Sequence, residues 1–317
     1  MIKVKLLKIA PYWLIALVFV IALQMGTFLF FSSPNITTAD IQPAIPEVLG
    51  ATTSLRGEIP SKTSELELFS APDPSAVKAK SFVVFDLDTG TTLFGKNTGQ
   101  RLQIASLTKL MTAFVTYQTT GLNQSFIVGQ NDTLNVSPDL GLKAGDTVKT
   151  ADVFDAMLIG SCNDAAKALA GYVSRTTGEN FIDLMNRQAL NFGMNNTKFS
   201  NPMGFDSVNN YSTADDLKLL IAATQKLSAF TSLGRRNGFQ FTSGEGNIYT
   251  ATATNKLLQT HPNINAIKTG YTNEAHGAMA TEVLENGHRV AILVLDSKNR
   301  EGDTLDLKDQ LEKVVSR

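Results

Sequence analysis

The chain has 317 residues, of which 28 are lysine or arginine and 29 are aspartate or glutamate, so its formal net charge is −1 at pH 7. This length can hold one large or two modest domains and can bury a substantial core. Because a balanced charge offers no basic surface to a polyanion, the composition argues against nucleic acid as a partner.

Cysteine and histidine are scarce. Cys162 is the single cysteine, which excludes an intramolecular disulfide and a thiolate metal cluster. The three histidines, at positions 261, 276 and 288, are far apart and lack the i, i+4 pairing of helical metal ligands. We therefore expect no metal, no cofactor and no serine–histidine pair.

The N-terminus carries three lysines in its first eight residues, followed by an uncharged apolar stretch, Ile9–Phe31. A helix needs ~20 apolar residues to cross a bilayer, and lysines at one end indicate a cytoplasmic N-terminus. Residues 1–31 are therefore expected to be a single-pass anchor in the cell membrane, with the rest of the chain extracytoplasmic. The alternative is a cleaved signal segment and a secreted protein, although Phe28–Phe31 and Pro34 occupy the place of a small-x-small cleavage site.

Residues 32–76 are rich in serine, threonine and proline and show no helical or strand period. Such a segment buries too little apolar surface to offset the entropy of ordering, which predicts a flexible tether. The alternative is that Leu66–Ser70 packs as an added strand.

The folded domain is expected over residues 77–317. Ser81–Phe85 and Thr91–Gly95 flank an acidic, glycine-containing turn and predict a β-hairpin. After Ser106, apolar residues recur at helical spacing, which predicts a buried helix to about Tyr117 that begins at the serine.

The remaining elements fall into a helical middle and a strand-rich end. Helices are expected at Thr150–Ile159, Asp164–Val173, Asn180–Phe192, Thr213–Gln225 and, last, Thr304–Val315. Strands are expected from Phe239 onward, including Ile264–Thr269, Gly277–Leu284 and Val290–Leu295. Strands from both chain ends predict an α/β fold of the α+β type, an antiparallel sheet with an inserted helical region.

The first chemical motif is Ser-x-x-Lys. Ser106 and Lys109 lie three positions apart at a helix start, so their side chains share one face and can touch. A serine is a weak nucleophile until a base takes its proton, and a lysine acts as that base when burial lowers its pKa. The pattern alone is weak, since Ser75–Lys78 repeats it at the end of the tether.

Two further motifs follow in order along the chain. Ser161 and Asn163 flank Cys162 between two predicted helices, where the serine can relay a proton and the asparagine can hold a substrate amide and the Lys109 amine. Lys268-Thr269-Gly270 follows an apolar strand residue, where Lys268 can attract an anionic terminus and Thr269 can hydrogen-bond it. Gly270, without a Cβ, lets a substrate backbone approach the strand.

The segments around these motifs resemble the serine-type D-Ala-D-Ala carboxypeptidases, the low-molecular-mass penicillin-binding proteins. The resemblance spans roughly residues 77–296 and is carried by Ile104–Ala113, Ser161–Ala166, Asn201–Phe205, Tyr211–Leu217 and Ile267–Thr272. Three short motifs that occur in this order, each within a longer matching segment, are a more specific indication of the family than any one motif alone.

The resemblance implies a penicillin-recognising serine transpeptidase-like fold and a catalytic domain at residues 77–317. It implies removal of terminal D-alanine from peptidoglycan stem peptides through an acyl-enzyme on Ser106, which β-lactams also acylate. Catalytic roles then fall to Ser106, Lys109, Ser161 and Asn163, and substrate binding to Lys268, Thr269, Gly270 and Tyr271. The oxyanion hole is implied to be the backbone N–H groups of Ser106 and Tyr271.

The chain departs from the family pattern at two places. Cys162 stands where glycine is usual, either as a small buried apolar residue or as a redox-sensitive brake. The family arginine that helps bind the substrate carboxylate has no clean match. Arg300 is the nearest candidate and Arg289 is expected to be an exposed strand residue, so both stay outside the expected site.

Three other functions compete. A D-alanyl crosslink endopeptidase of the same family uses the same residues. A class A β-lactamase needs a glutamate to activate the deacylating water, and no loop of that kind is evident in the sequence. A catalytically idle wall-binding or β-lactam-sensing module binds stem peptide without releasing D-alanine.

Overall fold

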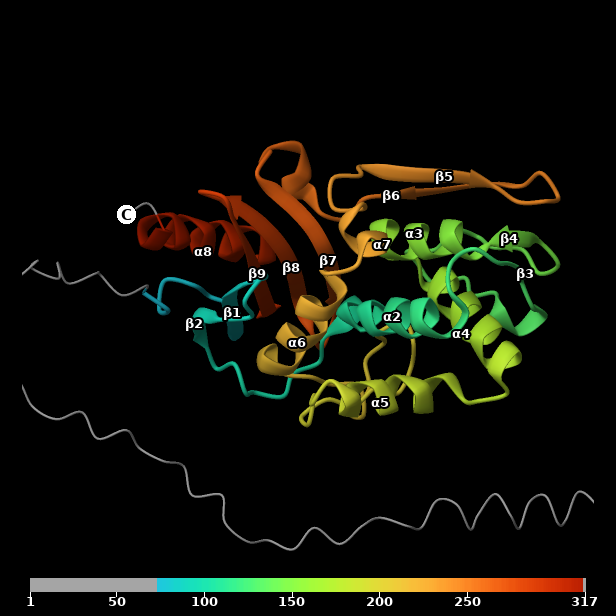
Figure 1. The fold of residues 1–317 in the computed structure, drawn as a ribbon, viewed down its shortest axis with the longest axis horizontal. Coiled ribbons are helices and arrows are strands. Elements are labelled where there is room, and N and C mark those ends of the chain that lie inside the picture. Colours follow the sequence, from blue (N-terminus) through green and yellow to red (C-terminus); the bar gives the residue numbers. More distant parts are fainter. Residues whose placement is uncertain (1–72, 316–317) are drawn as a thin grey trace, which may run out of the picture. The chain divides into compact units, whose positions relative to one another are not determined.

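The computed structural model describes residues 73–315 of the chain. Five strands form one antiparallel sheet in the order β2-β1-β9-β8-β7. They are β1 (Ser81–Asp86), β2 (Thr92–Lys96), β7 (Ile264–Thr272), β8 (His276–Glu285) and β9 (His288–Ser297). The sheet thus combines strands from both ends of the described residues, with β7 at one edge, which confirms the expected architecture (Figure 1).

The residues between β2 and β7 form the inserted helical region. Its helices are α2 (Thr108–Thr120), α3 (Thr150–Gly160), α4 (Asn163–Thr177), α5 (Phe181–Asn191), α6 (Ala214–Thr224) and the single-turn α7 (Ser228–Thr231). Two short antiparallel pairs join them: β3 (Ser125–Ile127) with β4 (Thr147–Lys149), and β5 (Gly238–Thr242) with β6 (Ile248–Thr252). The expected helices are confirmed, while the three-residue strands β3 and β4 are too short to carry a recognisable period.

Alternation along the strands explains how the sheet is covered on both faces. In β1, Val83 and Phe85 pack into the core shared with the helical region, whereas Phe82 and Val84 pack into the core under α8 (Arg300–Val315). Side chains of successive strand residues point to opposite faces. The sheet is therefore a middle layer, with α8 on one face and the helical region on the other (Figure 1).

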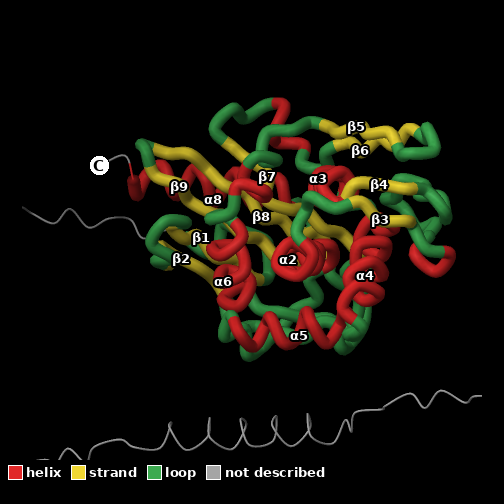
Figure 2. Tube along the Cα trace, turned by 45° about the vertical axis from the view of Figure 1, so that its right-hand side comes forward, coloured by secondary structure: helices red, strands yellow, loops and turns green. Residues whose placement is uncertain are grey.

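Helix α2 is the centre of the helical region. It packs against α3, α4, α5 and α6, and Figure 2 shows it between α4 and α6. Nine consecutive residues of α2, from Thr108 to Thr116, are buried, so the helix is apolar or hydrogen-bonded on all sides rather than amphipathic. A side chain at its first turn is held by packing from several directions.

The local boundaries differ from the expected ones in two instructive ways. Ser106 lies in a 3₁₀ turn, η1 (Ala105–Leu107), and α2 begins after it at Thr108. The residues expected to start two other helices, Asn180 and Thr213, are N-caps, whose side chains accept the backbone N–H groups of Ile182 and Asp216 at 2.9 and 3.1 Å.

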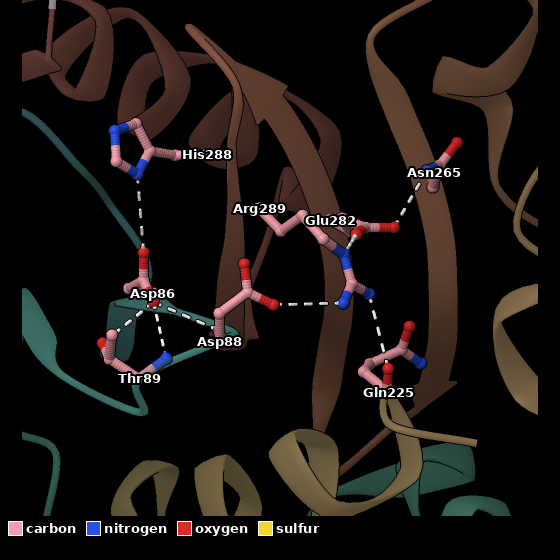
Figure 3. Close-up of polar contacts among 8 residues, drawn as sticks. All are labelled: Asp86, Asp88, Thr89, Gln225, Asn265, Glu282, His288 and Arg289. Atoms are coloured by element: carbon pink, nitrogen blue, oxygen red, sulfur yellow. Dashed lines mark hydrogen bonds and ion pairs between the residues drawn. The ribbon is translucent and has the colours of Figure 1, made fainter.

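Arg289, which is expected from the sequence to be an exposed strand residue, makes several polar contacts near the turn that joins β8 to β9. Its side chain is about one-third exposed, and Nε donates to Glu282 Oε1 at 2.6 Å. The guanidinium also donates to Asp88 Oδ1 at 3.3 Å and to the Gln225 carbonyl at 3.4 Å (Figure 3). Asn265 donates to the other oxygen of Glu282 at 2.9 Å, so the buried carboxylate is fully paired.

The expected anchor at residues 1–31, and all of the expected tether except its last four residues, lie outside the described residues. Val77 and Ala79 are fully buried beneath the sheet. Within residues 73–315, none of the helices has the length and apolarity needed to cross a bilayer. The second Ser-x-x-Lys copy lies at this boundary, where the exposed Ser75 hydroxyl donates to Asp73 at 2.6 Å.

Candidate active site

Ser106 and Lys109 meet at the junction of η1 and α2. Lys109 is the second residue of α2, and its Nζ lies 2.9 Å from Ser106 Oγ. Ser106 is partly exposed, whereas Lys109 is fully buried. A hydroxyl that a substrate can reach is therefore backed by an amine that solvent does not reach.

Three acceptors surround the Lys109 amine. Besides Ser106 Oγ, they are Asn163 Oδ1 at 2.8 Å and the Met203 carbonyl at 2.7 Å. Burial, as the largest cause, lowers the pKa of Lys109 to about 7. A neutral amine has two N–H bonds and one lone pair. When the two N–H bonds point at Asn163 and Met203, the lone pair faces Ser106, and this is the geometry of a general base.

Ser161 and Lys268 form a second buried pair across the site. Lys268 Nζ donates to Ser161 Oγ at 2.8 Å and to the Thr269 carbonyl at 2.9 Å. Burial lowers the pKa of Lys268 well below its usual value, and the nearby charge of Lys109 adds to this effect. Ser161 joins α3 to α4 with a left-handed φ of 60°, an unusual backbone for serine that turns the chain sharply between the two helices.

Glycines bring β7 and the loop after α5 against η1. A Cβ on Gly270 would lie 2.8 Å from Ser106 N and 2.9 Å from the Ala105 Cβ. A Cβ on Gly204 would lie 2.0 Å from the Ala105 carbonyl oxygen. The structure thus adds a reason for Gly270 beyond substrate approach, because the glycine leaves room for the nucleophile segment itself.

Lys268, Thr269, Gly270 and Tyr271 all lie within β7, which continues to Thr272 rather than ending at the motif. The Thr269 hydroxyl hydrogen-bonds the Thr254 hydroxyl, and the Tyr271 side chain is 65% exposed. Because β7 is an edge strand of the sheet, alternate backbone N–H groups face away from β8. The oxyanion role of the Ser106 and Tyr271 N–H groups stays a prediction.

Arg300 is the residue near the site that sequence reasoning left out. Its Nη1 donates to the Gly270 carbonyl at 2.7 Å, and its side chain is largely buried. The sequence signal for Arg300 was its position three residues after β9. That position comes close to β7 only once the sheet has formed. Arg289, the other candidate, lies at the opposite end of β8 and β9, paired with Glu282 as described above.

Cys162 is buried between Ser161 and Asn163 in the chain. It is 2% exposed, and burial, with a contribution from the Asp164 charge, raises the pKa of its thiol to about 12. The thiol therefore stays protonated at neutral pH and behaves as a small core residue. Among the described residues, His, Cys, Asp and Glu form no group of three or more that suits a metal ion.

Comparisons with known proteins identify the family to which the chain is similar. The family model described as Peptidase_S11, D-alanyl-D-alanine carboxypeptidase, matches residues 68–299. The D-alanyl-D-alanine carboxypeptidase DacC of Escherichia coli is 32% identical over 70% of this chain and 58% of its own length. DacF of Bacillus subtilis is 29% identical over 69% of this chain and 57% of its own length. The chain thus spans little more than half of these relatives.

An E. coli D-alanyl-D-alanine endopeptidase is 30% identical, and the match covers 75% of this chain and 76% of the relative.

Solved structures agree on the fold. The Streptomyces K15 DD-transpeptidase superposes with a TM-score of 0.69 at 26% identity, covering 76% of this chain and 98% of that one. A cefotaxime-bound penicillin-binding protein D2 from Listeria monocytogenes gives a TM-score of 0.62 at 27% identity, covering 75% and 97%. The fold is that of the penicillin-recognising transpeptidases, and the chain belongs to the peptidase S11 family of D-alanyl-D-alanine carboxypeptidases.

Proposed function

We propose that this chain is a serine-type D-Ala-D-Ala carboxypeptidase that removes terminal D-alanine from peptidoglycan stem peptides. One observation carries the proposal. Lys109 is fully buried, its pKa is lowered to about 7, and its two other contacts leave a lone pair for Ser106 at 2.9 Å. An activated serine in a family of D-alanyl-D-alanine carboxypeptidases supports acyl transfer from the D-Ala-D-Ala bond.

In the proposed acylation, Ser106 Oγ attacks the carbonyl carbon of the penultimate D-alanine while Lys109 takes the hydroxyl proton. The backbone N–H groups of Ser106 and Tyr271 stabilise the oxyanion. The C–N bond then breaks, and Ser161 delivers a proton to the leaving amine of the terminal D-alanine. Lys268 replenishes Ser161, to which its Nζ donates at 2.8 Å.

Deacylation returns the enzyme to its starting state. The proton that Lys109 took from Ser106 first returns to Lys268, which gave one to the leaving amine through Ser161, so the Lys109 amine is neutral again. A water molecule then attacks the ester carbonyl while Lys109 takes its proton. The ester bond to Ser106 Oγ breaks, and Lys109 gives this proton back to Ser106 Oγ. The shortened stem peptide leaves with a carboxyl group.

In the proposed substrate complex, Lys268 and Thr269 hold the carboxylate of the substrate's terminal D-alanine, and Asn163 holds a substrate amide. β-Lactams, which carry a carboxylate and a strained amide, enter as inhibitors that acylate Ser106.

The crosslink endopeptidase is the second candidate. It is favoured by the E. coli endopeptidase, of which this chain covers three quarters, a larger share than it covers of DacC or DacF. The same residues serve both reactions, since only the group on the leaving amine differs. An idle wall-binding module is disfavoured because Lys109 and Lys268 are both buried beside their serines, an arrangement costly to retain without use.

We further propose that the chain is held in the cell membrane by a single helix at residues 1–31, with the catalytic domain extracytoplasmic. The support is the uncharged stretch Ile9–Phe31 after three lysines, and a substrate class that lies outside the cytoplasm. Fractionation with and without signal peptidase inhibition tests it. A shortened chain in the medium would identify a cleaved segment instead.

The test of the reaction is D-alanine release from diacetyl-Lys-D-Ala-D-Ala by the full chain in detergent, beside a Ser106→Ala control. We expect release that the control loses. If the wild type is acylated by penicillin but releases D-alanine only from crosslinked dimers, the endopeptidase is correct. If the wild type shows no acylation by penicillin and no release of D-alanine, the idle module is correct.

A further inference from the structure

Asp164 is a buried carboxylate next to the catalytic asparagine, and none of the catalytic steps uses it. It is fully buried in the first turn of α4. Its Oδ1 accepts the backbone N–H groups of Leu140 and Ala165 at 2.9 and 2.8 Å, and its Oδ2 accepts that of Leu142 at 2.9 Å. A buried charge needs such partners to be tolerated, and here two of the three donors belong to one distant loop.

The loop at residues 136–142, which contains Leu140 and Leu142, also makes two hydrogen bonds with Asn163. The Pro138 carbonyl accepts the Asn163 backbone N–H at 2.7 Å, and the Val136 carbonyl accepts its Nδ2 at 3.0 Å. Residues 135–139 are exposed, so solvent competes for these contacts from outside. What holds the loop from beneath is the Asp164 carboxylate, through Leu140 and Leu142.

The loop decides which way the Asn163 amide points. Its oxygen and its NH₂ group have nearly the same shape, so packing alone does not distinguish the two orientations. The Val136 carbonyl requires a donor, which fixes Nδ2 there and leaves Oδ1 to accept from Lys109 Nζ at 2.8 Å. A flipped amide would put NH₂ against the amine, and Lys109 would lose one of the two acceptors that direct its lone pair at Ser106.

We propose that Asp164 is a positioning residue for acyl transfer: its carboxylate holds residues 136–142 against α4, and this loop orients the Asn163 amide toward Lys109. The inference rests on the proposed function, because it assigns Asp164 to the step in which Lys109 activates Ser106. Asp164 itself touches neither substrate nor nucleophile.

The charge of Asp164 adds an independent signature. It favours the protonated form of Lys109, opposing the burial that lowers the pKa of Lys109 to about 7. The other groups around this amine are Ser106, Asn163 and Met203, which are neutral, and Lys268, whose own pKa is lowered by burial and by the charge of Lys109. The Cys162 thiol is protonated at neutral pH. Removing the Asp164 charge therefore lowers the pKa of Lys109 further.

The test compares Asp164→Asn with wild type by the second-order rate constant for acylation by a fluorescent penicillin. Asparagine keeps the shape but presents NH₂ to a backbone N–H, which releases the loop. We expect a loss of about 10-fold or more, because small misplacements of catalytic groups are costly. The acidic limb of the pH profile should move to lower pH. The matched control is Asp303→Asn. Asp303 is a buried carboxylate of α8 that accepts the Lys78 backbone N–H at 2.9 Å, and its variant should be acylated at the wild-type rate.

A double-mutant cycle separates positioning from general damage. In an Asn163→Ala background, and at a pH on the upper plateau of the profile where Lys109 is neutral in every variant, Asp164→Asn should change acylation by less than about 2-fold, because its positioning route to Lys109 is already cut. An equal loss in both backgrounds, or wild-type acylation by Asp164→Asn, overturns the inference. If wild type itself is not acylated, the proposed function fails instead.

If Asp164→Asn does not fold, Asp164→Ser replaces it, because serine retains one hydrogen-bond acceptor. Its acylation rate constant should lie between those of wild type and Asn163→Ala, and the double-mutant cycle is repeated with this variant. Hydrogen exchange on the wild type gives a check without any variant. The Leu140 and Leu142 amides should exchange only on the time scale of global unfolding. Exchange as fast as an exposed loop overturns the inference.

Discussion

Asn163 Oδ1 lies 2.8 Å from Lys109 Nζ, so a residue at the start of α4 and a residue 54 positions earlier share one buried polar contact. Together with the Met203 carbonyl, Asn163 directs the Lys109 lone pair at Ser106. The activity of the serine therefore depends on how the helical region packs, and not on the Ser-x-x-Lys spacing alone.

Lys109→Arg should nearly abolish acylation while keeping a positive group in the site. A guanidinium stays protonated, so it has no lone pair for the Ser106 proton. We expect the acylation rate constant to fall by about 10²- to 10⁴-fold. Stopped-flow measurement with a fluorescent penicillin checks this, with thermal unfolding to show that the variant is folded. Acylation within a few-fold of wild type would mean that another group is the base.

Acylation should rise with pH through neutrality. The pKa of Lys109 is lowered to about 7, so the protonated, inactive form dominates below this pH and the neutral base above it. The rate constant should therefore climb between about pH 6 and pH 8 and then level off. A profile that is flat in this range, measured with the same penicillin at constant ionic strength, contradicts the lowered pKa.

Gly270→Ala should damage the site through contact rather than chemistry. The new Cβ would lie 2.8 Å from Ser106 N, so η1 or β7 must shift. We expect acylation to fall by about 10²-fold, the cost of an ångström-scale misplacement. Gly99→Ala is the matched control, since its Cβ would meet nothing closer than an Asp215 carboxylate oxygen at 3.9 Å. Equal activities of the two variants would rule the explanation out.

Cys162 should resist alkylation in the folded protein. Its thiol is 2% exposed and its pKa is raised to about 12, so little thiolate is available at neutral pH. Iodoacetamide at pH 7.5 should modify the chain only after denaturation, as intact mass will show. Rapid modification of the native protein with loss of acylation would revive the redox brake.

Arg289→Ala should cost stability without touching the chemistry. It leaves the buried Glu282 carboxylate with only Asn265 as a partner and cuts the links to Asp88 and Gln225 (Figure 3). Because Arg289 is about one-third exposed, we expect the free energy of unfolding to fall by about 2 kcal/mol, less than for a fully buried pair. Urea unfolding measures this, and a folded variant with impaired acylation would contradict a purely structural role.

Much of the fold was predictable because its signals are local. Strand alternation, capping residues such as Asn180 and Thr213, and the strand–helix–strand order give the sheet and the inserted helices. The expected start of α2 differs from the structure because Ala105 takes a left-handed φ of 46° and η1 precedes the helix, at the place where Gly204 and Gly270 approach it closely.

The site residues that carry motifs were identifiable one by one, but their contacts were not. The Met203 carbonyl is a backbone acceptor, and no side-chain pattern announces it. Arg300 reaches the Gly270 carbonyl only because α8 returns to the end of β7. The anchor and tether, which rest on composition, stay predictions.

The central claim, that Ser106 is the nucleophile activated by Lys109, is tested most directly by mapping the penicilloyl group after incubating the full chain with benzylpenicillin. Mass spectrometry of the digested protein should find one adduct, on the peptide that contains Ser106, and none in Ser106→Ala. An adduct on another residue, or undiminished labelling of Ser106→Ala, would contradict the account.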